Sequence, residues 1–247
     1  MIKVGNREVG YGYKPILSAE LSINHLGNVG TALEIVDSAK RAGADAIKTQ
    51  HYITEDFCTD KTATIELNGE QVNEYELFKS CELTLAEQRQ IAKRTHEHGL
   101  IFHTTPTTVE RIHEMNDYVD CWKISSDLFH CHELRQAAKD TGKPVIVSTG
   151  HVNNLAALKD DRPFADIYLH CVSQYPQEQV KGWKLKHLQE MFPYVGYSDH
   201  SGSADNIVTA TELGALWVEA HYAIDRNCAD ARFSIFPTDL QLLTKEL

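Results

Sequence analysis

The stretch TALEIVDSAKRAGADAIKTQ, residues 31–50, holds one helix-to-strand unit and sets the pattern for the rest of the chain. Its first part, Thr31–Ala42, has apolar residues at helical spacing, and Gly43 follows as a signal for the helix C-terminus. Its last part, Ala46–Gln50, has the short length typical of a strand. The stretch therefore predicts a helix that leads directly into a strand.

The same alternation recurs along the whole chain. Short apolar or β-branched runs predict strands at Ile16–Glu20, Ala46–Gln50, Ile101–Thr104, Cys121–Ile124, Val145–Ser148, Ile167–His170, Tyr194–Tyr197 and Trp217–His221. Helical spacing predicts helices at Thr31–Ala42, Ala86–His98, Val109–Met115, Leu134–Thr141, Trp183–Met191, Ala204–Leu213 and Thr238–Leu247. Strands that alternate with helices pair in parallel, and at 247 residues the natural closure is an α/β fold, the (β/α)8 TIM barrel. An open doubly wound sheet is the alternative, but no Gly-x-Gly-x-x-Gly turn follows the first strand.

Two segments stand outside this alternation. Ile2–Tyr13 predicts a short N-terminal hairpin that plugs the bottom of the barrel. Ile53–Leu83 is expected to be one long irregular connection, and long loops of compact domains are usually functional. Since no linker-like stretch divides the sequence, we expect residues 1–247 to form a single barrel domain.

Composition narrows the functional classes. Lys and Arg number 24 against 35 Asp and Glu, a net charge of −11, so the chain lacks the basic surface of a nucleic-acid-binding protein. No run of residues resembles a signal peptide or a membrane-spanning helix, so we expect no membrane partner. The six cysteines contain no Cys-x-x-Cys pair, which favours reduced thiols in the cytoplasm.

Polar residues gather where the predicted strands end, which is the face that carries the active site in barrel enzymes. Each residue alone has an ordinary explanation as a solvated or capping group, but all eight strands show the pattern. The candidates are Glu20, Lys48, Gln50, Thr105, Lys123, Ser126, Ser148, Ser173, Tyr175, Ser198, His200, Glu219 and His221.

These candidates divide by chemistry. Lys48 and Lys123, together with nearby hydroxyl groups, form a cradle suited to a phosphate, unless each lysine simply pairs with a neighbouring carboxylate. His200 and His221 come from adjacent strands and suit a divalent metal, with Gln50 or Glu20 as possible oxygen donors. A hydrogen-bonded histidine pair without metal is an equal alternative. Glu20 and Glu219 are candidate proton-transfer groups.

Seven stretches, spread in order over nearly the whole chain, resemble the sialic acid synthases. They are residues 19–25 (AELSINH), 43–50 (GADAIKTQ), 122–126 (WKISS), 142–150 (GKPVIVSTG), 169–176 (LHCVSQYP), 195–200 (VGYSDH) and 219–222 (EAHY). Members of that family are (β/α)8 barrels that condense phosphoenolpyruvate with an amino-sugar aldehyde, giving a nonulosonic acid and phosphate.

The resemblance assigns roles to the candidates. It implies that His200 and His221 hold a divalent metal, usually Mn²⁺, with Mg²⁺ or Co²⁺ possible. It implies that Glu20 is the acid/base residue, with Glu219 close by. It implies a phosphate site at Lys48, Thr105, Lys123, Ser126 and Ser148, a carboxylate site near Ser173 and Ser198, and a side facing the sugar and the metal at Gln50 and Tyr175.

The resemblance also implies a homodimer. Full-length relatives continue into a small antifreeze-like domain that supplies an arginine to the sugar, and residues 1–247 contain no such domain. Arg232 is a speculative substitute for that charge. Two alternatives stay open: a metal-dependent barrel aldolase or lyase acting on another acceptor, and a barrel that binds a sugar without turnover.

Overall fold

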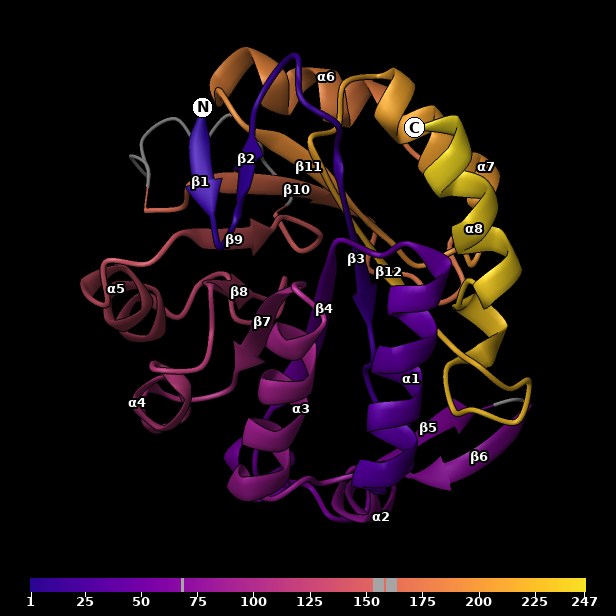
Figure 1. Ribbon diagram of the computed structural model, residues 1–247. Coiled ribbons are helices and arrows are strands. Elements are labelled where there is room, and N and C mark those ends of the chain that lie inside the picture. Colours follow the sequence, from indigo (N-terminus) through magenta and orange to yellow (C-terminus); the bar gives the residue numbers. More distant parts are fainter. Residues whose placement is uncertain (68, 153–157, 159–163) are drawn as a thin grey trace.

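The core of the molecule is a closed barrel of eight parallel strands (Figure 1). The computed structural model describes residues 1–67, 69–152, 158 and 164–247. The barrel strands, in chain order, are β3 (Ile16–Glu20), β4 (Ala46–His51), β7 (Ile101–Pro106), β8 (Cys121–Ile124), β9 (Val145–Ser148), β10 (Ile167–Cys171), β11 (Val195–Asp199) and β12 (Trp217–His221). Because β12 pairs with β3, the sheet has no open edge, and the predicted (β/α)8 barrel is confirmed.

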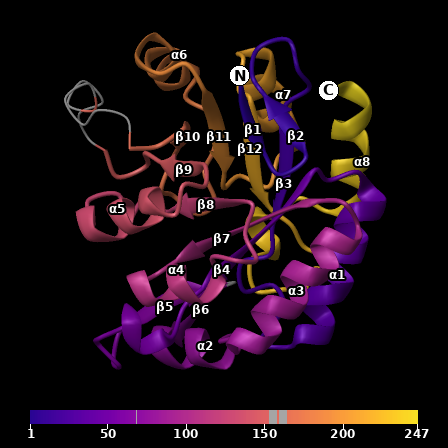
Figure 2. The same cartoon turned by 60° about the vertical axis from the view of Figure 1, so that its left-hand side comes forward.

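An outer layer of helices surrounds the barrel (Figure 2). These helices are α1 (Val29–Ala42), α3 (Leu85–Glu97), α4 (Val109–Met115), α5 (His132–Asp140), α6 (Gly182–Met191), α7 (Ala204–Glu212) and α8 (Pro237–Glu246). Local signals set their ends: Asn28 accepts a hydrogen bond from the Thr31 amide at the start of α1, and Gly43 ends that helix with φ of 97°. None of the described helices is long and apolar enough to cross a membrane.

The N-terminal hairpin closes the end of the barrel at which the strands begin, as predicted. Its strands are β1 (Ile2–Val4) and β2 (Arg7–Val9), which pair in antiparallel fashion. Val4 and Val9 are fully buried and pack in one cluster with the residues that begin the barrel strands, Ile16 and Ile101 among them. It lies at the opposite end of the molecule from the hairpin of β5 (Thr64–Leu67) and β6 (Glu70–Asn73) (Figure 1).

Residues alternate between the two faces of each barrel strand. In β4, Ile47 belongs to the apolar layer beneath the helices, while Lys48 belongs to a charged group inside the barrel. Since successive side chains of a strand point to opposite faces, Ala46, Lys48 and Gln50 share the inner face. The barrel interior is therefore apolar at the end where the strands begin and polar at the end where they finish.

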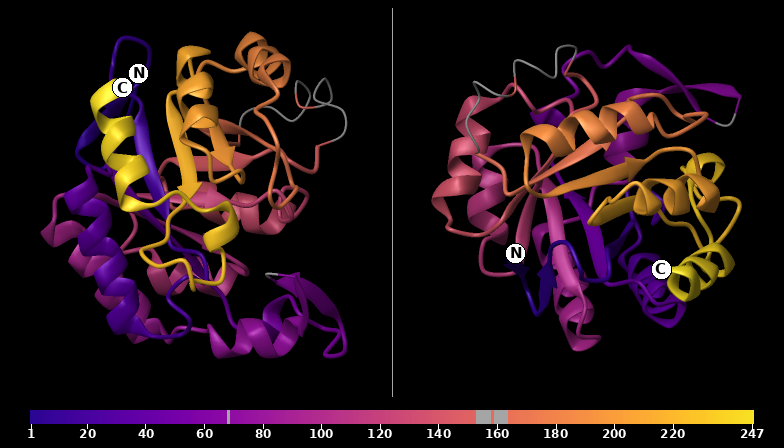
Figure 3. Two further views of the ribbon diagram at one scale, coloured as in Figure 1. Left: turned by 90° about the vertical axis from the view of Figure 1, so that its right-hand side faces the viewer. Right: turned by 90° about the horizontal axis from the view of Figure 1, so that it is seen from above.

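The connection between β4 and α3 corrects one prediction. The segment 53–83 is not irregular: it contains the one-turn 3-10 helix η1 (Thr54–Asp56), the hairpin strands β5 (Thr64–Leu67) and β6 (Glu70–Asn73), and α2 (Glu74–Ser80). Asn73 caps α2 by accepting a hydrogen bond from the Glu76 amide at 2.9 Å. The β5–β6 hairpin stands away from the barrel (Figure 3, left).

Candidate active site

Four charged residues from four strands meet inside the barrel, near the carboxyl ends of the strands. Lys48 of β4 forms an ion pair with Glu20 of β3 and lies 3.4 Å from Glu219 of β12. Lys123 of β8 lies 3.6 Å from the same Glu219 oxygen. All four are at least 95% buried, so the ion pairing that the sequence left open as an alternative does occur here. Two positive and two negative charges compensate one another in a volume from which water is largely excluded.

Burial and mutual charge set the protonation of this group. Burial is the main cause that lowers the pKa of Lys48, to about 8; Glu219 opposes this shift, and the nearby Lys123 adds to it. Burial alone would raise the pKa of Glu219, but the ammonium groups of Lys123 and Lys48 outweigh burial and hold it well below its usual range. Glu219 is therefore ionised between the two lysines, and Lys48 can gain or lose a proton near neutral pH.

Hydroxyl groups surround these charges, and two of them lack partners. Thr105 Oγ1 and Ser148 Oγ are buried without a hydrogen bond from the described residues. Ser126 Oγ accepts a hydrogen bond from the Gly150 amide at 2.9 Å, and Ser198 Oγ lies 3.5 Å from Glu219 Oε1. Buried polar atoms without partners are costly unless a ligand satisfies them, so these hydroxyls fit a polyoxygen anion.

Gly150 places Ser173 in the same group. A Cβ atom built on Gly150 would stand 2.3 Å from Ser173 Oγ and 2.8 Å from Ser126 Oγ. Only a residue without a side chain leaves these two hydroxyls beside each other and beside the Gly150 amide. The structure thus brings Ser173 together with the cradle, although its predicted role toward a carboxylate stays a prediction.

The two predicted metal ligands lie side by side. The ring centroids of His200 and His221 are 5.4 Å apart. His200 Nδ1 donates to the Val172 carbonyl at 3.0 Å, and His221 Nδ1 donates to the Asp230 carboxylate at 3.0 Å. In both rings the lone pair is therefore on Nε2. Burial, with a contribution from His221, lowers the pKa of His200 to about 3, so this ring is neutral at physiological pH.

This arrangement fits a divalent cation with open coordination positions. Histidine ligands of metals donate their other ring N–H to a carboxylate or a backbone carbonyl, as both rings do here. Among the described residues, no group of three or more His, Cys, Asp or Glu side chains is placed to hold a metal. A cation bound by His200 and His221 would take its remaining ligands from water, from substrate or from an amide oxygen such as that of Gln50.

Strand pairing places the cation site and the charged group at one level. Glu20 is paired in register with His221 on one side and with Lys48 on the other. Gln50 lies one inward position above Lys48, is partly exposed, and is in register with Thr105. Tyr175 covers the histidines from the loop after β10, with its ring centroid 4.2 Å from that of His200. Strand register therefore brings these residues to the same end of the barrel.

Sequence reasoning missed three residues that shape this site. Asp230 anchors His221, and Asn24 holds Asp230 in place by accepting a hydrogen bond from its amide at 2.8 Å. Phe233 packs on His221 with 5.0 Å between ring centroids. Asp230 and Phe233 lie in the loop between β12 and α8, beyond the strand ends that the barrel pattern singles out. The only sign of this loop in the sequence is Asp230 itself, an acidic residue nine positions after the candidate ligand His221.

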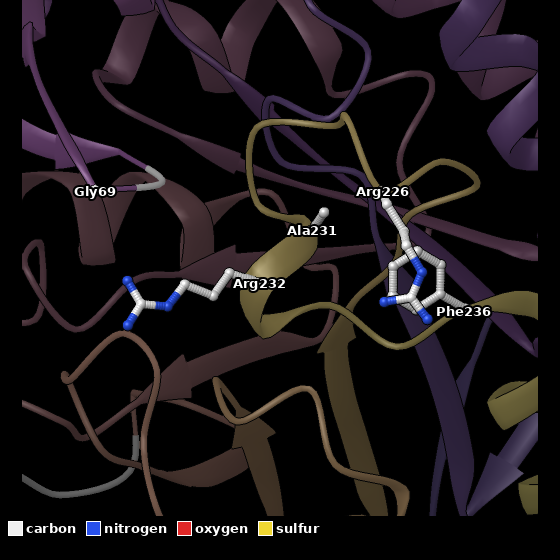
Figure 4. Close-up of a pocket in the computed structure, with 5 residues that line it drawn as sticks. All are labelled: Gly69, Arg226, Ala231, Arg232 and Phe236. Carbon is white, nitrogen blue, oxygen red and sulfur yellow. The ribbon is translucent and has the colours of Figure 1, made fainter.

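The same loop between β12 and α8 borders a cavity of about 360 Å³ (Figure 4). Arg226, Ala231, Arg232 and Phe236 line it together with Gly69 of the β5–β6 hairpin. Arg226 lies over the Phe236 ring, and Arg232 points away from it and lies 3.6 Å from Glu66. Arg232 is more than half exposed, and the speculative role of its charge toward a sugar is not tested by this geometry.

Comparison with known proteins places the chain among sugar-acid synthases. A model of the NeuB family matches residues 35–247. An uncharacterized protein of Methanocaldococcus jannaschii is 36% identical over 92% of this chain and 67% of its own length. The pseudaminic acid synthase of Campylobacter jejuni is 33% identical over 90% of this chain and 69% of its own length. The crystal structure of an N-acetylneuraminic acid synthetase from Leptospira borgpetersenii superposes with a TM-score of 0.89 at 29% identity, covering 99% of this chain and 86% of that one.

Proposed function

Because this chain belongs to the NeuB family of synthases, we propose that it condenses phosphoenolpyruvate with an amino-sugar aldehyde to give a nonulosonic acid and phosphate. The family membership confirms the resemblance found in the sequence and the expectation of an enzyme. The observation that supports the substrate pair is the buried charged group of Glu20, Lys48, Lys123 and Glu219, which lies at the same end of the barrel as the unpartnered hydroxyls and the histidine pair.

The proposed reaction forms one carbon–carbon bond and breaks one carbon–oxygen bond. The methylene carbon of phosphoenolpyruvate attacks the aldehyde carbon, whose oxygen becomes a hydroxyl by taking up the proton that the attacking water releases. Water adds to the resulting cationic centre at C2, and the tetrahedral intermediate then expels phosphate from that carbon. The phosphate would be held by Lys48, Lys123, Thr105, Ser126 and Ser148, the carboxylate by Ser173 and Ser198, and the sugar by Gln50 and Tyr175.

Ion pairing in the free protein prepares the proton-transfer groups. When a phosphate engages Lys48, that ammonium group is shared with the anion, and Glu20 loses part of its compensation. Glu20 Oε1 stays fixed by the Ser22 amide at 2.7 Å, so the carboxylate keeps its orientation and can accept a proton from the attacking water. Glu219 remains ionised beside Lys123 and offsets the excess positive charge near the reacting carbon.

His200 and His221 would hold a divalent cation, which we propose to be Mn²⁺, with Mg²⁺ or Co²⁺ as substitutes. Such a cation supplies Lewis-acid polarisation of an aldehyde oxygen. The anchored Nδ1 atoms and the lone pairs on both Nε2 atoms support this assignment. By family resemblance we further propose a cytoplasmic homodimer, which light scattering on the eluted peak of a size-exclusion column would test.

Phosphate release from phosphoenolpyruvate, measured with Mn²⁺ and a panel of aldoses, tests the proposed function. Release that depends on one amino sugar supports the condensation, and absence of release with every sugar refutes it. Phosphoenolpyruvate labelled with ¹⁸O at the bridging oxygen tests the bond cleavage, because carbon–oxygen cleavage transfers the label to phosphate. A Lys123→Met variant should lose phosphoenolpyruvate binding, whereas the matched control Lys139→Met, far out on α5, should keep it.

A further inference from the structure

Tyr175 makes a direct hydrogen bond to one of the two candidate metal ligands. Its hydroxyl lies 3.2 Å from His200 Nε2. Since His200 Nδ1 carries the proton donated to the Val172 carbonyl, Nε2 is the acceptor and the tyrosine O–H is the donor. The bond therefore occupies the lone pair with which His200 would bind a cation.

The second imidazole is not capped in this way. Among the described residues, none makes a hydrogen bond to His221 Nε2, and Phe233 covers the ring with an apolar contact at 5.0 Å between centroids. One of the two lone pairs is thus free for a cation, and the other is already used by Tyr175.

Tyr175 also screens the histidines from solvent. Tyr175 is 55% exposed, whereas His200 and His221 beneath it are only 6% and 9% exposed. The Tyr175 ring also contacts Phe233, with 5.2 Å between centroids, so the two aromatic rings together cover the imidazoles. A cation that reaches His200 must move the Tyr175 ring or its hydroxyl.

The loop that carries Tyr175 is fixed on both sides of it. Before the tyrosine, the Val172 carbonyl accepts the His200 Nδ1–H; after it, the Gln177 amide donates to the His200 carbonyl at 2.9 Å. Buried Gln177 also donates to the Tyr197 hydroxyl. Residues 173–176 lie between these two anchors, so Tyr175 can turn away while the His200 ring keeps its orientation.

We propose that Tyr175 is a gate to the cation site: its hydroxyl caps His200 Nε2 in the metal-free protein and is displaced when a divalent cation binds. This inference rests on the cation site of the proposed function. It adds a cost to cation binding, namely the loss of one hydrogen bond, and it makes the tyrosine hydroxyl available to substrate only after the cation is in place.

The Tyr175→Phe variant tests the gate, because it keeps the aromatic ring and removes only the hydroxyl. Titration calorimetry with Mn²⁺ alone should show about two- to tenfold tighter binding than in the unmodified protein, the range expected for the net value of one hydrogen bond. The matched control is Tyr75→Phe, which removes a hydroxyl bond to Glu55 in the β4–α3 connection and should leave Mn²⁺ affinity unchanged. Unchanged or weaker binding in Tyr175→Phe overturns the gate.

A second readout requires no metal and no turnover. Diethyl pyrocarbonate acylates the lone pair of a neutral imidazole, and mass mapping gives the rate at each histidine. The rate at His200, relative to His221, should rise in Tyr175→Phe, and an unchanged ratio contradicts the proposal. If neither protein binds Mn²⁺, the gate is also refuted, whereas the phosphate-release assay decides separately whether the condensation occurs.

Discussion

Raising the pH from about 7 to about 9.5 should weaken the binding of phosphoenolpyruvate, because Lys48 loses its proton in this interval. In the protein without phosphoenolpyruvate, burial is the main cause that holds the pKa of Lys48 at about 8. A bound phosphate group would stabilise the charged form of this lysine. Below the pKa the lysine is already charged, so affinity is level. Above it, each further pH unit should raise the Kd about tenfold, because binding must first restore the proton.

Calorimetric titration with phosphoenolpyruvate, without sugar or metal, measures this dependence. The series begins near pH 7, above the last ionisation of the phosphate at about pH 6, so that only the protein titrates. The control is Lys48→Arg, whose guanidinium keeps its charge and should give a level profile over the whole range. A level profile in the unmodified protein, or an equal decline in Lys48→Arg, would refute the assignment of Lys48 to the phosphate site.

Three further outcomes are expected. Asp230→Asn should lower Mn²⁺ affinity about 10- to 100-fold in calorimetry, because the anchored imidazole loses its carboxylate partner, and unchanged affinity would contradict that role. Asp37→Asn should lower the free energy of urea unfolding by about 1 kcal/mol at neutral pH, since it removes a bidentate pair with the partly exposed Arg94. The Arg94 hydrogen bond lowers the pKa of Asp37, so the stabilisation is present above the usual carboxyl range and is lost as the pH falls through the lowered pKa. The unfolding free energies of Asp37→Asn and the unmodified protein should therefore converge in acid. A difference that stays constant with pH would disprove the link between this ion pair and stability. Gly150→Ala should weaken phosphoenolpyruvate binding without unfolding the protein, because the added Cβ meets Ser126 Oγ at 2.8 Å, and normal binding in a titration would exclude that contact from the site.

Much of the fold was predictable because its signals are local. The helix of residues 31–42 carries its own cap residues, and the strand that begins at Ala46 follows three residues after Gly43. The closed barrel brings the carboxyl ends of its strands to one face, so residues at strand ends, such as Lys48 and His221, could be grouped without knowing any contact. The β5–β6 hairpin gave no such signal, because its strands are four residues long and none of the side chains described in them is fully buried.

The finer arrangement of the site depends on contacts between distant segments. Glu219 lies between two lysines that precede it by 171 and 96 positions, and only the barrel register fixes the separations of 3.4 and 3.6 Å. Asp230 reaches His221 because its loop is tied to Asn24, which is 206 positions away along the chain. No spacing rule relates these residues, so the sequence supplied the chemical groups but not their pairing.

The alternation of side chains along β12 couples the substrate chemistry to the integrity of the fold. Glu219 and His221 face the cavity, while Val218 and Ala220 belong to the layer beneath the helices. A one-residue deletion in this strand ahead of Glu219 would turn both Glu219 and His221 outward at once and bring apolar residues into the charged interior. Insertions in the loops that follow the strands would instead leave the proposed phosphate and cation ligands in register.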